Sequence, residues 1–137
     1  MTLGVGIDLC DIARMERELA REDGGFRDQV FGPAEIAYCE AMHRPAMHYA
    51  ARFAAKEAVF KALTAAGVTG ATWRDVEILR GPAGEPRVVL HGAVGRLAHE
   101  RGVGEVAVSL SHTRELAAAC AAVEWENGAA RRVEGGE

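Results

Sequence analysis

Glu57 is a carboxylate at a position that should hold an apolar side chain. It lies four residues after Phe53 and three before Phe60, so helical geometry places it within the apolar stripe of the segment 52–63. A charge in such a stripe is costly unless an opposite charge or a metal pairs with it. Two interpretations are open: a helical ion pair with Lys61, which contributes about 0.2–0.5 kcal/mol, or a site of chemistry.

Asp8 occupies an equally unusual position near the amino terminus. Alternation in residues 3–9 predicts a strand with apolar side chains on one face and Gly4, Gly6 and Asp8 on the other. Two glycines weaken a strand, so they indicate that a backbone or a ligand approaches this face closely. If the helix that carries Glu57 packs there, the carboxylates converge, and two oxygen ligands suit Mg²⁺, which completes its octahedron with water and phosphate. Alternatively, the glycines only permit close packing and Asp8 ends the strand.

Three cations surround the second carboxylate. Arg52, Lys56 and Lys61 lie within about two and a half turns of the helix that carries Glu57. Arginine binds phosphate through paired hydrogen bonds and lysine supplies a mobile charge, so this set predicts a phosphate site. A solvated basic face would explain the cations but not the acid between them.

Several stretches resemble the signature segments of the holo-acyl-carrier-protein synthases, a family of 4'-phosphopantetheinyl transferases. They are residues 4–8, 52–62 and 108–113, with a turn at 84–87 that matches in position. The resemblance covers residues 2 to about 124, in the family's order and spacing. It implies a 4'-phosphopantetheinyl transferase-like fold and a homotrimer with its sites at subunit interfaces.

The resemblance also implies a reaction. Members of the family transfer the phosphopantetheine arm of coenzyme A to a serine of an apo acyl carrier protein and release adenosine 3',5'-bisphosphate. By position, Asp8 and Glu57 would be the Mg²⁺ ligands, and Lys61 would stabilise or protonate the leaving phosphate. These three residues are the catalytic set, and either Glu57 or a metal-bound water takes the serine proton.

Further residues are assigned to the coenzyme A site by the same resemblance. They lie in the turn and in the late strand and loop, which in the family reaches the nucleotide from the neighbouring subunit, and they are Pro86, Arg87, Ser111, His112 and Thr113. The alternative for the histidine is a loop side chain bonded to nearby backbone.

A basic docking surface is expected because the carrier protein should be acidic, although this chain has a net charge of -4. The helix that begins near Asp11, a good N-cap residue, carries Arg14, Arg17 and Arg21 at helical spacing. In the family this helix meets the carrier, and such charges steer encounter more than they add affinity. A solvated face partly neutralised by glutamates is the alternative.

Composition narrows the class of protein. A chain of 137 residues is long enough for one domain with a core. It has no apolar run of membrane-spanning length, and we expect no signal peptide before the first strand. Three cysteines without paired spacing indicate a reducing compartment, and the net charge argues against nucleic-acid binding. We therefore expect a cytoplasmic enzyme without a membrane or nucleic-acid partner.

The pattern of elements predicts an α+β fold in a single domain over residues 1–125, followed by a disordered tail at 126–137. The expected order is β-α-α-α-β-β-α-β-β, with boundaries near 2–9, 12–22, 33–42, 46–66, 73–79, 87–91, 93–101, 105–111 and 115–125.

Two functions of other classes remain open on these residues. One is a Mg²⁺-dependent phosphohydrolase that acts on a nucleotide pyrophosphate, with Asp8 and Glu57 as ligands and water as the nucleophile. The other is a non-catalytic module that binds a carrier protein or a nucleotide.

Overall fold

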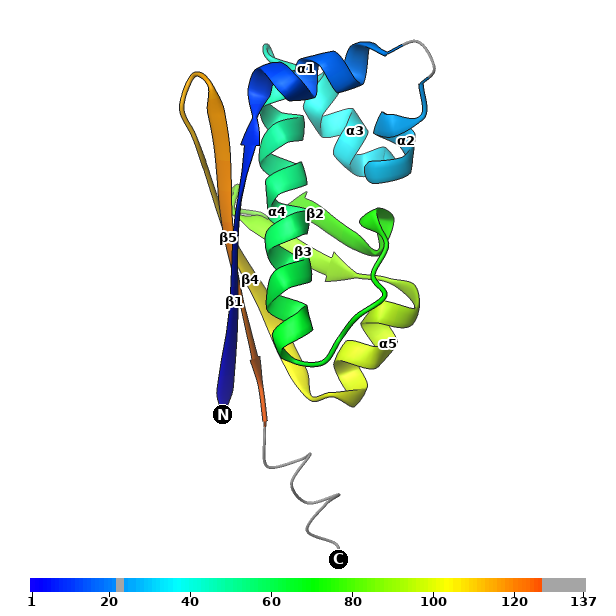
Figure 1. Ribbon diagram of the computed structural model, residues 1–137, viewed down its shortest axis with the longest axis vertical. Coiled ribbons are helices and arrows are strands. Elements are labelled where there is room, and N and C mark those ends of the chain that lie inside the picture. Colours follow the sequence, from blue (N-terminus) through cyan, green and yellow to red (C-terminus); the bar gives the residue numbers. More distant parts are fainter. Residues whose placement is uncertain (22–23, 127–137) are drawn as a thin grey trace, which may run out of the picture.

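The computed structural model describes residues 1–21 and 24–126. Within these ranges, no helix has both the length and the apolar character needed to span a bilayer. The elements (Figure 1) are β1 (Thr2–Asp11), α1 (Ile12–Ala20), α2 (Phe26–Val30), α3 (Pro33–Glu40), α4 (Pro45–Ala65), the 3-10 turn η1 (Trp73–Asp75), β2 (Val76–Arg80), β3 (Pro86–Leu90), α5 (Gly92–Glu100), β4 (Val103–His112) and β5 (Leu116–Trp125).

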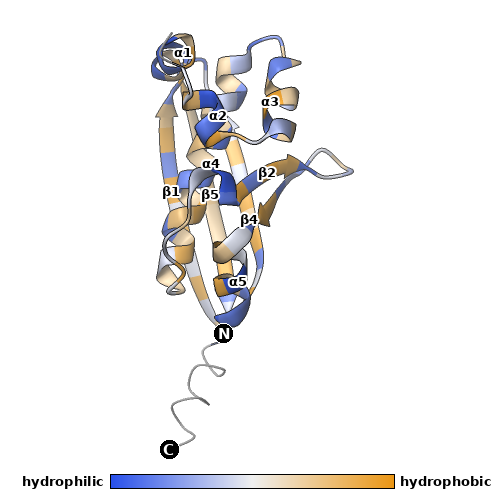
Figure 2. Ribbon diagram, turned by 90° about the vertical axis from the view of Figure 1, so that its right-hand side faces the viewer, coloured by the Kyte–Doolittle hydropathy of each residue, from blue (hydrophilic) through white to orange (hydrophobic). Residues whose placement is uncertain are grey.

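A three-stranded antiparallel sheet and the long helix α4 form the centre of the molecule. The strand order is β1-β5-β4, so β1 and β4 are the two edges. Helix α4 runs along one face of this sheet (Figure 1), where alanines on both elements, such as Ala58 and Ala121, are buried and allow close approach. The β2–β3 hairpin projects from one side (Figure 2). The predicted α+β class is confirmed.

The two glycines of β1 set the distance between the strand and α4. A Cβ atom on Gly6 would lie 2.0 Å from the carbonyl oxygen of Ala58, and one on Gly4 would lie 2.8 Å from that of Ala62. Real Cβ atoms do not come so close to a carbonyl oxygen. The expectation that a backbone approaches this face of the strand is therefore confirmed.

The apolar side chains of β1 point away from α4. Leu3, Val5, Ile7 and Leu9 are 58–68% exposed and lie on the outer face of the sheet. An amphipathic strand would normally turn such a face inward. Here the face with the glycines packs against α4, so the apolar face of the strand lies on the outside of the sheet.

The predicted element order is correct except for α2, whose five residues are too few to show a period. The strand expected from residue 73 begins at Val76, because the Asp75 side chain accepts a hydrogen bond from Thr72 N (3.0 Å) and stabilises a 3-10 turn. The predicted tail lies outside the described residues, apart from Glu126.

Candidate active site

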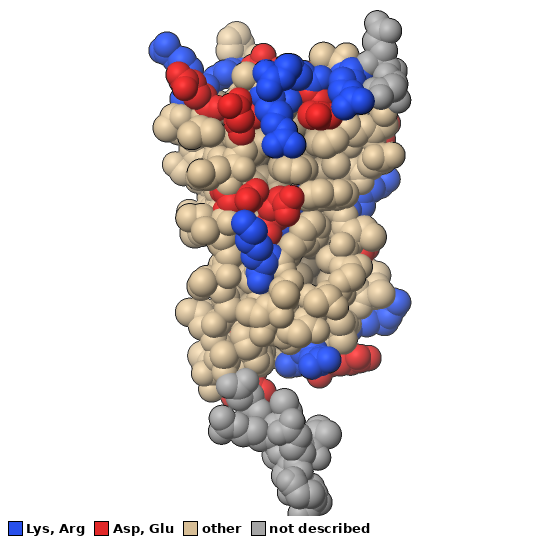
Figure 3. All heavy atoms as spheres, in the orientation of Figure 1, with Lys and Arg blue, Asp and Glu red and all other residues tan. Residues whose placement is uncertain are grey.

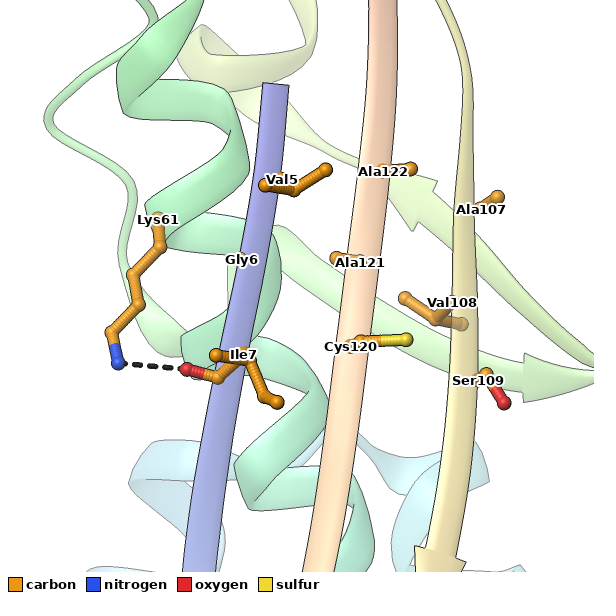
Figure 4. Close-up of a pocket in the computed structure, with 10 residues that line it drawn as sticks. All are labelled: Val5, Gly6, Ile7, Lys61, Ala107, Val108, Ser109, Cys120, Ala121 and Ala122. Carbon is orange, nitrogen blue, oxygen red and sulfur yellow. Dashed lines mark hydrogen bonds between the residues drawn. The ribbon is translucent and has the colours of Figure 1, made fainter. Parts of the chain in front are cut away.

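The close packing of α4 on β1 brings Glu57 and Asp8 together. Burial is the main effect that raises the pKa of Glu57, the Asp8 carboxylate raises it further, and the Lys61 ammonium opposes both. Lys61 Nζ donates hydrogen bonds to Asp8 Oδ1 (3.1 Å) and to the carbonyl oxygen of Ile7 (2.9 Å), the second of which Figure 4 shows. Figure 3 shows a compact group of acidic and basic atoms surrounded by uncharged surface on this side of the molecule. The structure thus joins three of the predicted site residues.

The donor set of this acid pair fits Mg²⁺. Asp8 and Glu57 are two carboxylates, and the described residues contain no group of three or more His, Cys, Asp or Glu side chains suited to a metal. Mg²⁺ commonly uses one or two carboxylates and completes its shell with water and substrate phosphate. The donor set therefore suits a metal that binds together with a phosphorylated substrate.

A second feature is a basic cavity of about 320 Å³ between α3, α4, the β2–β3 hairpin and β4. Its lining includes four basic or titratable side chains around one aromatic ring: Arg52, Arg80, His48, His112 and Tyr38. The guanidinium carbon of Arg52 lies 4.0 Å from the centroid of the Tyr38 ring, and that of Arg80 lies 5.3 Å from it. The ring is thus a platform for both cations.

The electrostatics of the basic cavity favour an anion. Arg52 is only 5% exposed, and its Nε has no hydrogen-bond partner among the described residues. No carboxylate lines the cavity. Burial, and then the charge of Arg52, lower the pKa of His48. A buried guanidinium N–H without an acceptor is costly, so this site suits a ligand that brings negative charge.

Lys56 does not belong to either site. Its side chain has no exposed area, and its ammonium donates to Glu35 Oε1 (3.0 Å), to Trp73 O (2.9 Å) and to Val76 O. Because all three donors are used inside the fold, the structure contradicts the prediction that Lys56 contacts a phosphate.

The residues predicted for the coenzyme A site do not all lie together, because neighbouring residues on a strand point to opposite faces of the sheet. His112 and Pro86 line the basic cavity. Ser111 and Arg87 are exposed on their strands and do not line it, and Arg87 Nε lies 3.4 Å from a carboxylate oxygen of Glu85. Thr113 Oγ1 accepts hydrogen bonds from the backbone of the β4–β5 turn, at 3.3 and 3.1 Å. Within one chain, the cavity therefore contains two of the five predicted residues.

The acid pair and the basic cavity lie at opposite edges of the sheet. Asp8 is on β1, whereas Leu110 and His112 belong to β4, and β5 runs between these strands. Two strand spacings amount to about 10 Å. Arg52 and Glu57 also lie about 140° apart around α4, because they are five residues apart on the helix. One chain thus presents two half-sites that face different directions.

Helix α1 carries the predicted docking arginines. The predicted N-cap is confirmed, since Asp11 Oδ1 accepts a hydrogen bond from Arg14 N (3.1 Å). Arg14 and Arg17 are exposed, and Arg21 follows the last helical residue in extended conformation. Figure 3 shows a band of acidic and basic side chains over this end of the molecule.

A partly apolar groove of about 170 Å³ lies beside Arg14 of the predicted docking set, and Asp11 and Glu18 also line it. Arg14 lines one side of it, and the apolar members of its lining are Leu9, Met15, Phe26 and Phe53.

Sequence reasoning missed Tyr38, His48 and Arg80. His48 lies four residues before Arg52 and so shares its helix face. Arg80 is paired with Pro86 across the hairpin, a position that the turn at 84–87 already marks. Tyr38 gives no such signal, because only the tertiary fold brings α3 to the cavity.

Comparison with known proteins decides the family. The model of the 4'-phosphopantetheinyl transferase superfamily matches residues 4–121. The chain belongs to this superfamily. A holo-[acyl-carrier-protein] synthase of Moorella thermoacetica is 52% identical over 89% of this chain and 94% of its own length. One of Syntrophus aciditrophicus is 44% identical over 90% and 97%.

A solved structure gives the same result for the fold of this transferase-superfamily member. The ACPS-CoA complex of Chronobacterium ammoniagenes matches with a TM-score of 0.82 at 30% identity, covering 92% of this chain and 99% of that one. The predicted family is confirmed. The range matched by the family model includes Asp8, Glu57 and Lys61, together with Arg52 and His112 of the basic cavity.

Proposed function

We propose that this protein transfers the 4'-phosphopantetheine arm of coenzyme A to a serine hydroxyl of an apo acyl carrier protein, in a reaction that depends on Mg²⁺. The observation that carries the proposal is that Lys61 bonds Asp8 and that both charges act on Glu57, in a chain of this superfamily. The relatives are named holo-[acyl-carrier-protein] synthases, and one of the similar solved structures is a complex with coenzyme A.

Asp8 and Glu57 would hold the metal, and Lys61 would act on the leaving group. When bound, Mg²⁺ would neutralise the charge that develops on the pyrophosphate as the bridging phosphorus–oxygen bond breaks. The serine oxygen gives its proton to Glu57 or to water and forms the new bond to phosphorus, and adenosine 3',5'-bisphosphate leaves with the electron pair of the broken bond. The Lys61 ammonium, which lies 3.1 Å from Asp8, donates a hydrogen bond to the departing phosphate.

Intact mass spectrometry tests the reaction directly. Incubation with coenzyme A, Mg²⁺ and an apo carrier should add the mass of the arm to the carrier, and chelation of the metal should stop the addition. Glu57→Gln should abolish transfer without altering the circular dichroism spectrum. Hydrolysed coenzyme A with an unmodified carrier would instead indicate a phosphohydrolase, and binding without turnover would indicate a non-catalytic module.

The basic cavity is the proposed site for the 3'-phosphate of coenzyme A. Coenzyme A carries two anionic groups, the pyrophosphate and the 3'-phosphate. The acid pair and its metal would bind the pyrophosphate, so the 3'-phosphate needs a second site. Arg52 and Arg80 offer guanidinium donors to it. Arg52→Met or Arg80→Met should raise the KM for coenzyme A about 10- to 100-fold, the effect expected from a lost charge-assisted hydrogen bond. Dephospho-coenzyme A lacks this phosphate, so its KM should not change. An equal rise for both substrates would remove the assignment.

The proposed assembly is a cyclic homotrimer in which neighbouring copies complete each site. A contact between the β1 edge of one copy and the β4 edge of the next is heterologous, and such a contact forms a ring when the rotation between copies closes. It would unite the acid pair with the basic cavity and cover the apolar outer face of β1. The number of three copies comes from the family resemblance.

Subunit mixing tests this arrangement. Glu57→Gln and the double variant Arg52→Met/Arg80→Met damage opposite half-sites, so a mixture should contain some intact sites and recover activity at low coenzyme A. Ile7→Asp should yield monomers by light scattering and lower the rate. Absence of recovery in a mixture that has exchanged subunits would place both half-sites within one chain.

The carrier is proposed to dock on α1. Arg14, Arg17 and Arg21 would meet an acidic helix of the carrier, and the neighbouring partly apolar groove would take an apolar side chain from it. Arg14→Ala with Arg21→Ala should raise the KM for the carrier more than that for coenzyme A, and the effect should shrink at high salt. An unchanged carrier KM would remove this docking surface.

We place the enzyme in the cytoplasm. Cys10, Cys39 and Cys120 are free thiols in the described chain, which agrees with a reducing compartment.

A further inference from the structure

A fully buried ion pair belongs to neither half-site. The side chains of Lys56 on α4 and Glu35 on α3 are 0% and 1% exposed, and Lys56 Nζ lies 3.0 Å from Glu35 Oε1. Burying two charges costs several kcal/mol per ion, and an apolar pair of similar size is often as stable or more so. Stability alone therefore gives little reason for this pair.

Every polar atom of the pair is used, and its partners come from several elements. Lys56 Nζ also donates to the carbonyl oxygens of Trp73 and Val76. Glu35 Oε1 accepts a hydrogen bond from Gly32 N (2.8 Å), and Glu35 Oε2 accepts one from Ile78 N (2.8 Å). The network thus fixes α4 against α3, the 3-10 turn and β2 in one arrangement.

The 3-10 turn connects the network to the helix face on which Glu57 lies. The Trp73 ring stacks on Phe53 at 4.9 Å and packs against Phe60 at 5.2 Å. These two phenylalanines are the residues four before and three after Glu57. Lys56 is therefore linked, through Trp73, to the helix turn that presents Glu57.

The network is also close in sequence to the basic cavity. Glu35 lies three residues before Tyr38, so both belong to one face of α3. Lys56 lies four residues after Arg52 on α4. On the next strand, Ile78 lies two residues before Arg80.

We infer that the Lys56–Glu35 pair is a positioning element that sets the rotation of α4 so that Glu57 meets Asp8 in the geometry a metal requires. The inference rests on the proposed function. A carboxylate stands about 5–6 Å from its helix axis, so a rotation of about 15° moves it about 1.4 Å. Mg²⁺ requires oxygen ligands at about 2.0–2.1 Å in a near-ideal octahedron, and a shift of that size breaks the site.

The test is Mn²⁺ binding to the whole protein, with the metal alone and without substrate. Lys56→Met removes the ammonium but keeps most of the apolar stem, and it should raise the Kd for Mn²⁺ about tenfold, as substitutions of supporting residues around metal sites do. Coulomb's law alone predicts tighter Mn²⁺ binding, because this variant removes a positive charge from the residue next to Glu57. Unchanged or tighter binding by the folded variant would overturn the inference.

A second variant keeps the test decisive if Lys56→Met does not fold. Trp73→Leu changes no charge and removes the ring that contacts Phe53 and Phe60, so it should weaken Mn²⁺ binding about threefold or more, again as loss of a supporting residue does. Binding within twofold of the parent would contradict the positioning role.

Two controls separate the possible failures. Val94→Ala removes two methyl groups from a residue of α5 that is 2% exposed and lies outside the network. It should lower the stability of the fold and leave the Kd for Mn²⁺ within twofold of the parent value. Glu57→Gln should weaken Mn²⁺ binding strongly. If Glu57→Gln has no effect, the proposed metal site is wrong. If it has an effect and either folded Lys56→Met or Trp73→Leu has none, the positioning inference alone is wrong.

Discussion

Substituting Gly6 with alanine is the sharpest perturbation of the contact that forms the acid pair. A methyl group there would lie 2.0 Å from the carbonyl oxygen of Ala58, 3.0 Å from its carbonyl carbon and 2.9 Å from Lys61 Cβ. Most of these atoms are backbone, so no side-chain rotation relieves the overlap. Helix α4 and β1 must move apart.

The size of the movement follows from ordinary contact distances. Carbon and oxygen atoms in close contact lie about 3.3–3.6 Å apart, so the helix must retreat by about 1.3–1.6 Å. Overpacking of this kind costs about 1–3 kcal/mol of unfolding free energy. A displacement of about 1 Å at a catalytic group can lower the rate about 100-fold. Because Glu57 and Lys61 are on the helix and Asp8 is on the strand, the reaction should suffer more than the fold.

Denaturant unfolding and the mass-spectrometric transfer assay measure the two effects. Gly6→Ala should lower the unfolding free energy by about 1–3 kcal/mol and kcat/KM by about 100-fold. Gly4→Ala should have the same direction and a smaller size, because its closest contact is 2.8 Å. Gly104→Ala is the matched control, since a Cβ there meets nothing within 4 Å. If Gly6→Ala behaves like Gly104→Ala in both assays, the close approach of α4 to β1 does not set the site.

Thiol reactivity and pH dependence offer two more checks. Burial raises the pKa of Cys10 to about 11 and that of Cys39 to about 12, so in the monomeric Ile7→Asp variant at pH 8 iodoacetamide should label the exposed Cys120 far faster than either. Equal rates by peptide mass mapping would contradict this burial. Burial and Arg52 lower the pKa of His48 below its ordinary 6.5, so the unfolded chain binds more protons just below pH 6.5 and stability should fall as the pH drops through that value. His48→Gln should flatten this part of the stability profile, and an unchanged slope would refute the assignment.

Local pattern was enough to predict the acid pair. The alternation of residues 3–9 and the two glycines in it led to a close approach by a backbone, and the structure confirms that approach. The position of Glu57 relative to Phe53 and Phe60 depends only on helical geometry. What the pattern did not reveal is that the apolar face of β1 points outward.

The burial of Lys56 could not be predicted from the local sequence pattern, for a physical reason. Alanines make α4 compatible with burial on several sides. A helical wheel therefore does not distinguish which of Arg52, Lys56 and Lys61 is exposed to solvent. Burial of Lys56 is decided by Glu35 and by the backbone of residues 73–76, which lie 17 to 21 residues away in the chain. The basic cavity is likewise assembled from segments that are distant in sequence.

The strand order has a consequence for how the chain acquires its structure. The central strand β5 is the last element of the sheet to be synthesised, and β1, the first, pairs only with it. Translation at about 5–20 residues per second leaves β1 without its partner for about 5–20 s. During that time its apolar side chains and unpaired backbone are open to other chains. Yield in the cell should therefore depend on chaperones that protect a nascent amino-terminal segment.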